Sequence, residues 1–261
     1  MNSALWVAKT GLDAQQSRMS VVSNNLANVN TTGFKKGRAS FEDLLFQHVK
    51  QVGAPTSQQT DSPTGLSLGT GVRVGATEKT FAQGNLQQTS NPLDLAINGR
   101  GFFQVLLPDG TAAYTRDGSF QISATGDLVT SNGYAVQPGI NIPDGAQTLT
   151  VGSDGTVAVQ FAGESQPQQV GTLQITDFVN PAGLQPQGNN LFTESGSSGP
   201  PQTGTASLNG LGPLIQGSLE ASNVNVVEEL VNMIETQRAY EMNSKAISTA
   251  DQMLQYVSQN L

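Results

Sequence analysis

Apolar residues recur every seven positions at the start of the chain, within a helix predicted to cover residues 1–33. The repeat forms an a/d seam of about four heptads, which favours a left-handed supercoil with another helix. Asn2 or Ser3 can cap the start of this helix, and Gly33 suits its end. The stripe is formed by Leu5, Leu12, Met19, Val22 and Leu26.

A second apolar stripe occupies the last part of the chain, residues 222–261. Asn225 stands at an N-cap position with Glu228 three residues later, as in a capping box, so a helix is expected to begin here. The stripe is formed by Leu230, Met233, Ile234, Tyr240, Ile247 and Leu254. Both ends of the chain are therefore predicted to be long amphipathic helices that pair as a coiled coil.

The region between the two helices changes in pattern. Residues 34–75 and 205–221 are polar or rich in Gly, Ser and Pro, and they are predicted to be extended linkers, the first with a long polar loop. Residues 76–204 alternate apolar and polar positions between pairs such as Asn132-Gly133 and Asp154-Gly155, which suit hairpin turns. The sequence thus predicts an α+β fold with a terminal helical coiled-coil domain, extended linkers and an antiparallel β-rich domain.

One copy of the chain has more apolar helix surface than a single helix pair can cover. Burial of the five side chains of the first stripe could contribute on the order of 10 kcal/mol, but only where another surface covers them. Pairing buries one seam and leaves a further flank that includes Trp6, Val227 and Val231. Either the chain's own β domain or other copies cover this flank. The linkers favour other copies, because they hold the helices away from the β domain.

Charge is sparse and unevenly placed along the chain. The formal net charge is −8 and only 12% of residues are charged, so nucleic acid is not an expected partner. Residues 1–116 hold ten Lys and Arg against seven Asp and Glu, whereas residues 117–237 hold eleven acids and no Lys or Arg. This pattern suits an acidic soluble β domain, and it also suits identical subunits that stack with opposite poles in contact. No apolar run is long enough for membrane insertion to be expected.

The residues that enzymes use are few in this sequence. Cysteine is absent and His48 is the only histidine, so no catalytic residue, metal or cofactor is predicted. The glycine pairs at residues 69–71 and 99–101 lack the further residues of a nucleotide-binding loop. Two alternatives stay open: a cell-wall hydrolase that uses two of the eleven acids in or near the β region, and a binding module built on that region.

Three motifs resemble those of the flagellar rod and hook protein family. They lie at residues 23–35, at residues 222–241, and in the middle at residues 98–103 and 114–120. Their order and their spread over the whole chain make the resemblance specific. The end motifs are carried by Asn25, Leu26, Ala27, Asn28, Gly33, Phe34, Asn223, Val224, Gln237, Arg238 and Tyr240.

The resemblance implies a structural subunit that polymerises into a hollow helical shaft, crosses the periplasm and carries motor torque to the hook. The terminal helices would line the inner tube, and the β domain would form an outer layer. The start of the chain and residues 41–46 most resemble subunits of the distal rod, with a proximal rod or hook subunit as the alternative. The implied partners are other copies of the chain, proximal rod subunits, the hook subunit, the surrounding P and L ring proteins, and the flagellar type III export apparatus.

Export follows from the same resemblance. The first residues lack the basic region, apolar run and cleavage site of a secretory signal, and the family leaves through the type III apparatus without cleavage. Phe41 and Leu45 resemble the short motif that export substrates offer to the export gate. The polar loop at residues 46–66 is expected to lie along neighbouring subunits and to stiffen the shaft.

Overall fold

The computed structural model describes residues 3–53, 55–57, 60–61, 63–163 and 166–259. The chain divides into two compact units, and each unit combines segments that are far apart in the sequence. The first unit comprises Met1–Leu26, Gly37–Glu78 and Val226–Leu261, and the second comprises Ala27–Lys36 and Lys79–Asn225.

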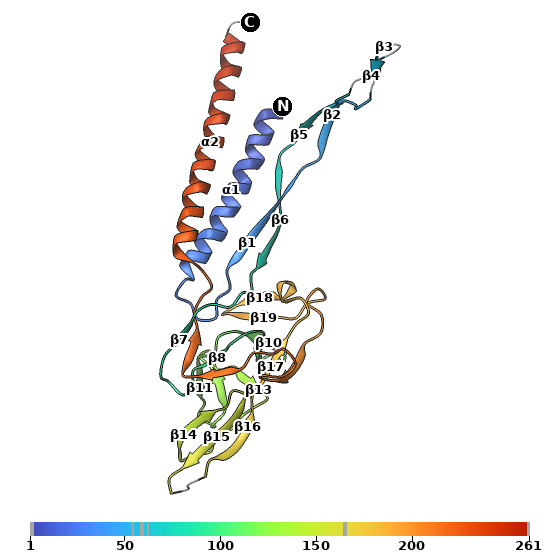
Figure 1. Ribbon diagram of the computed structural model, residues 1–261. Coiled ribbons are helices and arrows are strands. Elements are labelled where there is room, and N and C mark those ends of the chain that lie inside the picture. Colours follow the sequence, from blue (N-terminus) through green and yellow to red (C-terminus); the bar gives the residue numbers. More distant parts are fainter. Residues whose placement is uncertain (1–2, 54, 58–59, 62, 164–165, 260–261) are drawn as a thin grey trace. The chain divides into compact units, whose positions relative to one another are not determined.

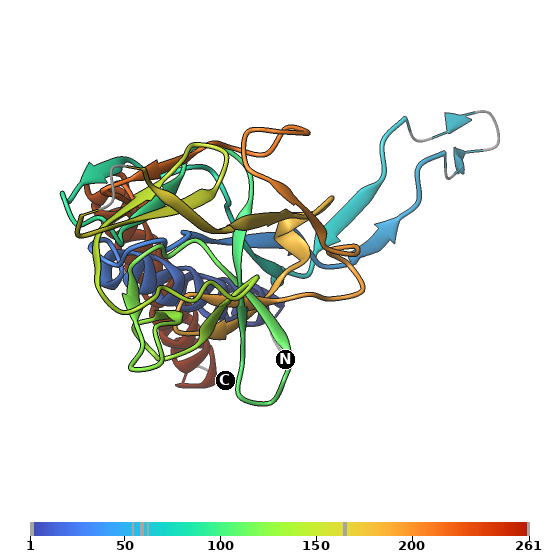
Figure 2. The ribbon, with the colours of Figure 1, turned by 90° about the horizontal axis from the view of Figure 1, so that it is seen from below.

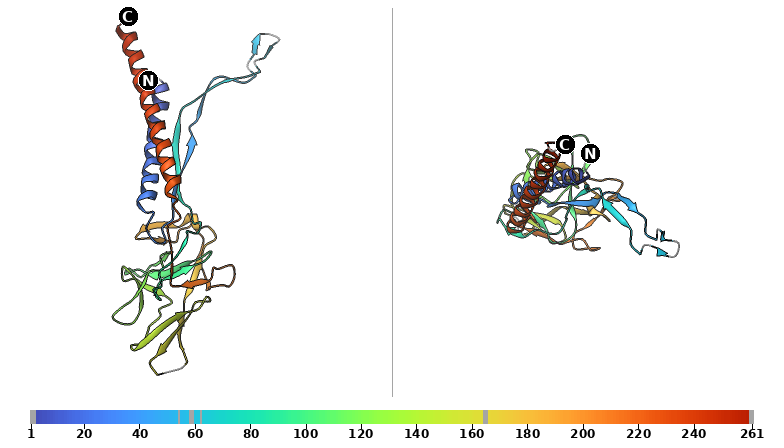
Figure 3. Two further views of the ribbon diagram at one scale, coloured as in Figure 1. Left: turned by 60° about the vertical axis from the view of Figure 1, so that its left-hand side comes forward. Right: turned by 90° about the horizontal axis from the view of Figure 1, so that it is seen from above.

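The first unit is built on two long helices, α1 (Ser3–Ala27) and α2 (Val226–Gln259). They lie side by side and antiparallel (Figure 1; Figure 3), which confirms the predicted pair of terminal helices. α1 ends earlier than Gly33 because Thr31 turns back on Asn28, to which both its amide and its hydroxyl donate hydrogen bonds. No helix in the described part of the chain is long and apolar enough to cross a membrane.

A long two-stranded ribbon completes the first unit, and Figure 2 shows its paired strands in blue and light blue. β2 pairs with β5 and β3 pairs with β4, both antiparallel, while β1 pairs with β6. The segment 34–75, expected to be an extended linker, thus contains paired strands. The strands are β1 (Gly37–Asp43), β2 (Phe46–Lys50), β3 (Pro55–Ser57), β4 (Thr60–Asp61), β5 (Leu66–Gly69) and β6 (Val72–Lys79).

The second unit is antiparallel β structure, as predicted, and its largest sheet has nine strands among the described residues. β9 lies at the centre of this sheet and pairs with β10, β13 and β17. The nine strands are β9 (Phe102–Leu106), β10 (Ala112–Thr115), β11 (Phe120–Ile122), β12 (Leu128–Thr130), β13 (Ala135–Gln137), β17 (Gln174–Asp177), β18 (Gln185–Gly188), β19 (Leu191–Thr193) and β20 (Gln202–Thr205).

The second unit also contains smaller sheets. β14, β15 and β16 form a three-stranded sheet, β8 pairs with β21, and β7 pairs with β22. A short 3-10 helix spans Pro181–Gly183. The remaining strands are β7 (Leu86–Gln88), β8 (Leu95–Ile97), β14 (Ala146–Val151), β15 (Thr156–Phe161), β16 (Gln168–Thr172), β21 (Leu214–Gln216) and β22 (Ser218–Glu220).

The core of the second unit follows from the alternation of side chains along its strands. Val157 and Val159 point the same way from β15, and both are buried. Phe103 packs edge-on against Phe120, with ring centroids 5.0 Å apart. Gly133 adopts a φ of +84°, which suits the hairpin turn predicted for it.

Candidate assembly surface

The contact between α1 and α2 is made by small and polar side chains. Ala14 and Thr236 are buried, and the space between Gly11 and Asn243 is so narrow that a Cβ at Gly11 would lie 3.0 Å from the Asn243 amide nitrogen. Further along the pair, the guanidinium of Arg18 donates a hydrogen bond to the side chain of Asn232 at 3.3 Å. At these points the helices therefore approach closely through small and polar residues.

The predicted stripe residues differ in how far the folded chain covers them. Val22 is buried, whereas six others are half-buried: Leu5, Leu12, Met19, Leu26, Met233 and Ile247. Four residues of α2 are exposed: Leu230, Ile234, Tyr240 and Leu254. A single copy thus leaves most of the α2 stripe accessible to solvent, whereas the α1 stripe is buried or half-buried.

Additional large apolar side chains are exposed on the same two helices. On α2 they include Val227, of which 69% is exposed, and Val231, Met242, Met253 and Tyr256. Trp6 and Val7 of α1 are also exposed. Apolar surface on this scale, repeated along two helices, is typical of protein–protein contact rather than of a free monomer surface.

In both units, residues of the N-terminal motif region contact residues of the C-terminal motif region. In the first unit, Asn25 is buried, exchanges two hydrogen bonds with the backbone of Gly37, and donates a third to Glu229 at 3.3 Å. In the second unit, the amide of Lys36 donates to the Oδ1 of Asn223 at 2.7 Å. The Asn223 side chain also donates to the carbonyls of residues 80 and 82.

Other motif residues take different positions. Gly33 has a φ of +67°, and its amide donates to the carbonyl oxygen of Glu220 at 2.8 Å. Phe34 is buried beneath the Nζ of Lys79, which lies 4.4 Å from the ring centroid. Val224 is buried and Asn28 is half-buried, whereas four motif residues are exposed: Ala27, Gln237, Arg238 and Tyr240.

The two residues that resemble an export motif lie on the ribbon. Phe41 belongs to β1, and Leu45 follows it between β1 and β2. Leu45 is the more accessible of the two, with 89% of its surface exposed. Both are therefore available to a partner in the folded chain.

A buried cluster of three charged side chains in the second unit was not predicted from the sequence. Lys35, Arg116 and Glu220 are each at most 4% exposed. Lys35 also donates to the carbonyl of Ala82, and Glu220 also accepts from the amide of Gly84. Burial lowers the pKa of Lys35, and the neighbouring Glu220 carboxylate opposes that shift. The cluster joins the segment that follows α1 to the strand that precedes α2.

Two acidic side chains of the β region form hydrogen bonds within its turns. Asp109 and Asp154 each accept hydrogen bonds from the amide and hydroxyl of a threonine two residues later, and these bonds lower the pKa of both carboxyl groups. His48 lies exposed on β2 with its Nδ1 2.8 Å from the Oγ of Ser67. Among the described residues, no group of three His, Cys, Asp or Glu side chains could hold a metal ion.

These features define a class of protein: an α+β structural subunit whose terminal helices pair closely and present apolar side chains outward. Three family models match the chain: the flagella basal body rod protein at residues 5–35, the flagellar hook protein FlgE/F/G D1 domain at residues 96–159, and the flagellar basal body rod FlgEFG protein C-terminal region at residues 215–260.

Full-length relatives give the same result. A protein named flagellar basal-body rod protein FlgG from Buchnera aphidicola subsp. Schizaphis graminum is 57% identical over 99% of this chain and 100% of its own length. Proteins of the same name from Borreliella burgdorferi and Bacillus subtilis are 48% and 38% identical, each over 97% or more of both chains. The chain belongs to the family of flagellar basal-body rod proteins.

Proposed function

We propose that this chain is a structural subunit of the distal rod, and that many copies polymerise head-to-tail into a hollow helical shaft that transmits motor torque to the hook. Membership of the rod family and the similarity to relatives named flagellar basal-body rod protein FlgG support this assignment. The observation that carries it is the exposure of large apolar side chains along α2 and of Trp6 and Val7 on α1, because these surfaces gain stability only when neighbouring copies cover them.

The division of contacts on the helices supports the same proposal. Small and polar residues such as Gly11, Asn243 and Asn232 make the close contact of the pair within one copy. The large residues, such as Leu230 and Ile234, remain outside. A subunit arranged in this way folds its helix pair first and keeps its apolar surface for assembly, so growth occurs at the end of a polymer where partners are present.

Partners and location follow from the distal rod assignment. The shaft would span the periplasm, join proximal rod subunits at one end and the hook subunit at the other, and turn within the P and L ring proteins. Export would use the flagellar type III apparatus without signal cleavage, with Phe41 and Leu45 as the motif offered to the export gate. The exposed position of both side chains supports that role.

The assembly surface is tested by placing a charge in the exposed stripe. Ile234→Asp is expected to abolish rod formation while leaving the helix content of the monomer unchanged, because residue 234 is already half in solvent in one copy. Ser248→Asp is the matched control, since it adds the same charge at an exposed polar position of α2. Sedimentation of polymer and circular dichroism of monomer measure the two properties.

Two results would count against the proposal. Rods formed by Ile234→Asp at the wild-type yield would show that the stripe is not an assembly surface. Equal protease protection of α1 and α2 in dilute monomer and in assembled rods would show that assembly does not cover the helices.

A further inference from the structure

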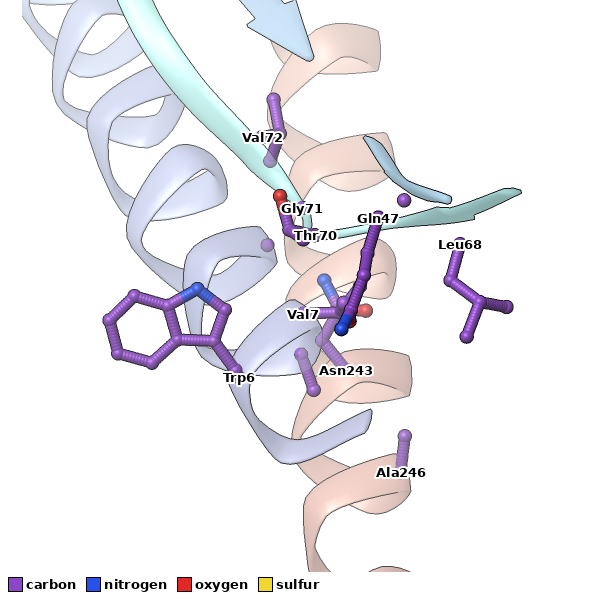
Figure 4. Close-up of a pocket in the computed structure, with 12 residues that line it drawn as sticks. Trp6, Val7, Gln47, Leu68, Thr70, Gly71, Val72, Asn243 and Ala246 are labelled. Carbon is purple, nitrogen blue, oxygen red and sulfur yellow. The ribbon is translucent and has the colours of Figure 1, made fainter. Parts of the chain in front are cut away.

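A groove in the first unit lies between the two helices and the ribbon. Its volume is about 830 Å³, and Figure 4 shows its walls coming from α1, α2 and the turn between β5 and β6. The side chains that line it are mainly apolar. They belong to Trp6, Val7, Ala8, Gln47, Leu68, Thr70, Val72, Asn243 and Ala246, with Gly11, Gly69 and Gly71 between them.

Small residues keep this groove open. Gly71 has a φ of +121° and lies so close to α1 that a Cβ there would be 2.1 Å from the Oγ1 of Thr10. The next amide, that of Val72, lies 3.3 Å from the same oxygen and donates to it. The ribbon is thus fixed against α1 beside the groove, whose lining includes the small residues Ala8, Gly11 and Ala246.

The first two turns of α2 carry a ridge that is suited to such a groove. Val227, Leu230, Val231 and Ile234 are spaced i, i+3, i+4 and i+7, so they share one face of the helix. Their exposed fractions lie between 43% and 69%. This spacing of apolar anchors is the one that helices use when they bind in a hydrophobic groove.

The charges beside the groove and the ridge are complementary. Lys9 and Lys245 are exposed and adjacent in sequence to groove residues, and the Nζ of Lys9 lies 5.6 Å from the centre of the Trp6 ring. Glu228 and Glu235 are exposed and adjacent to ridge residues, and Glu235 also lies 3.8 Å from the guanidinium of Arg18 in the same copy. Approach of the ridge to the groove therefore brings basic and acidic side chains together at the rim.

The groove and the ridge lie far apart on the same helix. The groove includes residues 243 and 246 of α2, whereas the ridge is centred near residue 230, so they are separated by about 20 Å along the helix axis. The ridge of one copy therefore cannot enter its own groove. A second copy displaced along the axis by about this distance can place its ridge there.

We propose that this groove receives the α2 ridge of a second copy of the chain. The proposal rests on the self-assembly argued above and specifies one contact within it. Because the two surfaces differ and lie at different heights, each copy can offer its ridge to one neighbour and its groove to another. Such a contact does not close on itself and continues as an open polymer.

Cysteine cross-linking tests this pairing directly, because the natural chain contains no cysteine. Full-length Ala8→Cys and Leu230→Cys proteins are mixed, assembled into rods and oxidised, and the products are separated without reductant. Cross-linked dimers are expected from mixed rods and not from rods of either variant alone. Ser20→Cys mixed with Leu230→Cys is the matched control, since residue 20 is exposed on α1 outside the groove, and it is expected to give no dimer.

The possible results separate the two proposals. Rods that form from the mixed variants without an Ala8–Leu230 cross-link overturn this pairing and leave self-assembly intact. Failure of the wild-type chain to polymerise under any assembly condition overturns the proposed function instead.

A size-compensation experiment answers the same question if the cysteine variants do not assemble. Ala8→Leu narrows the groove and is expected to raise the critical concentration for polymerisation roughly tenfold. Leu230→Ala in the same chain is expected to restore it, because the smaller ridge fits the narrower groove. Absence of that recovery overturns the pairing.

Discussion

The Nζ of Lys35 lies 2.5 Å from the Oε1 of Glu220, and both side chains are almost entirely withdrawn from solvent. The second oxygen of the same carboxylate lies 3.3 Å from the Nη1 of Arg116. Two buried cations therefore share one carboxylate. Since α2 begins shortly after Glu220, this ion cluster fixes the segment from which the C-terminal helix starts.

Glu220→Gln is expected to destabilise the second unit by about 3–5 kcal/mol, because it leaves Lys35 and Arg116 buried without a counter-charge. Hydrogen exchange of the amides in β7 and β22 measures the local free energy of opening. Glu194→Gln is the control: residue 194 is exposed in the same unit, and a change within about 0.5 kcal/mol is expected. Unchanged protection in Glu220→Gln would contradict the role given to the cluster.

Gly33→Ala tests the motif glycine. Its φ is +67°, and a Cβ there would lie 2.6 Å from the backbone nitrogen of Asp117, so strain and overlap act together. Gly133→Ala is the matched control, because its φ of +84° imposes similar strain with no atom within 4 Å. Thermal unfolding is expected to show that Gly33→Ala loses more free energy of unfolding than Gly133→Ala, by on the order of 1–3 kcal/mol. Equal losses would mean that the close approach at Gly33 is unimportant.

The sequence predicted the elements that follow from local pattern. The heptads of Leu5, Leu12 and Met19 predicted α1, and Asn225 marked the residue before α2. Asn132-Gly133 predicted a hairpin turn that the positive φ of Gly133 confirms. In each case the physical determinant is contained in a short stretch of chain, which is why it can be read there.

Contacts between distant residues could not be read in the same way. Lys35 and Glu220 are separated by 185 residues, and no periodicity links them. The strands of the ribbon lacked a signal because few of their side chains are buried, so no apolar alternation marked them. The helix contacts of Gly11 with Asn243 and of Arg18 with Asn232 were also missed, because a search for apolar stripes gives no weight to small and polar residues.

The pH dependence of stability is expected to respond to Asp117. Burial raises the pKa of its carboxyl group and Asp94 adds repulsion, although hydrogen bonds from Ser119 oppose the shift. A carboxyl group whose pKa is higher in the folded state than in the unfolded state stabilises the fold most at pH values below its unfolded pKa of 3.8. This stabilisation is lost as the pH rises through the folded pKa. Asp117→Asn should therefore raise the melting temperature at pH 7 and leave it unchanged near pH 3.

Asp127 provides a control of opposite sign. Hydrogen bonds from Asn141 and Thr125 lower the pKa of its carboxyl group, so its stabilisation is present above pH 3.8 and is lost as pH falls through the folded pKa. Asp127→Asn should lower the melting temperature at pH 7 and have no effect at low pH. If the melting temperatures of the two variants changed with pH in the same direction relative to wild type, the environments assigned to both carboxylates would be wrong.

The stiffness of the shaft is expected to depend on the ribbon. Exposed apolar residues continue along β2 and β5, including Phe46, Val49 and Leu66, and the proposed role of this hairpin is to lie along neighbouring copies. Removing residues 51–63, some of which lie outside the described part of the chain, takes away the β3–β4 pair but should leave both units folded, because α1, α2, the other strands of the ribbon and the sheets of the second unit are built from other segments. Rods of this variant should show a shorter persistence length in electron micrographs. In a second variant, residues 51–63 are replaced by a Gly/Ser segment of equal length. This variant keeps the length of the hairpin and removes its side-chain contacts, so it separates the effect of the contacts from the effect of the length. A persistence length equal to that of wild-type rods in both variants would refute the stiffening role.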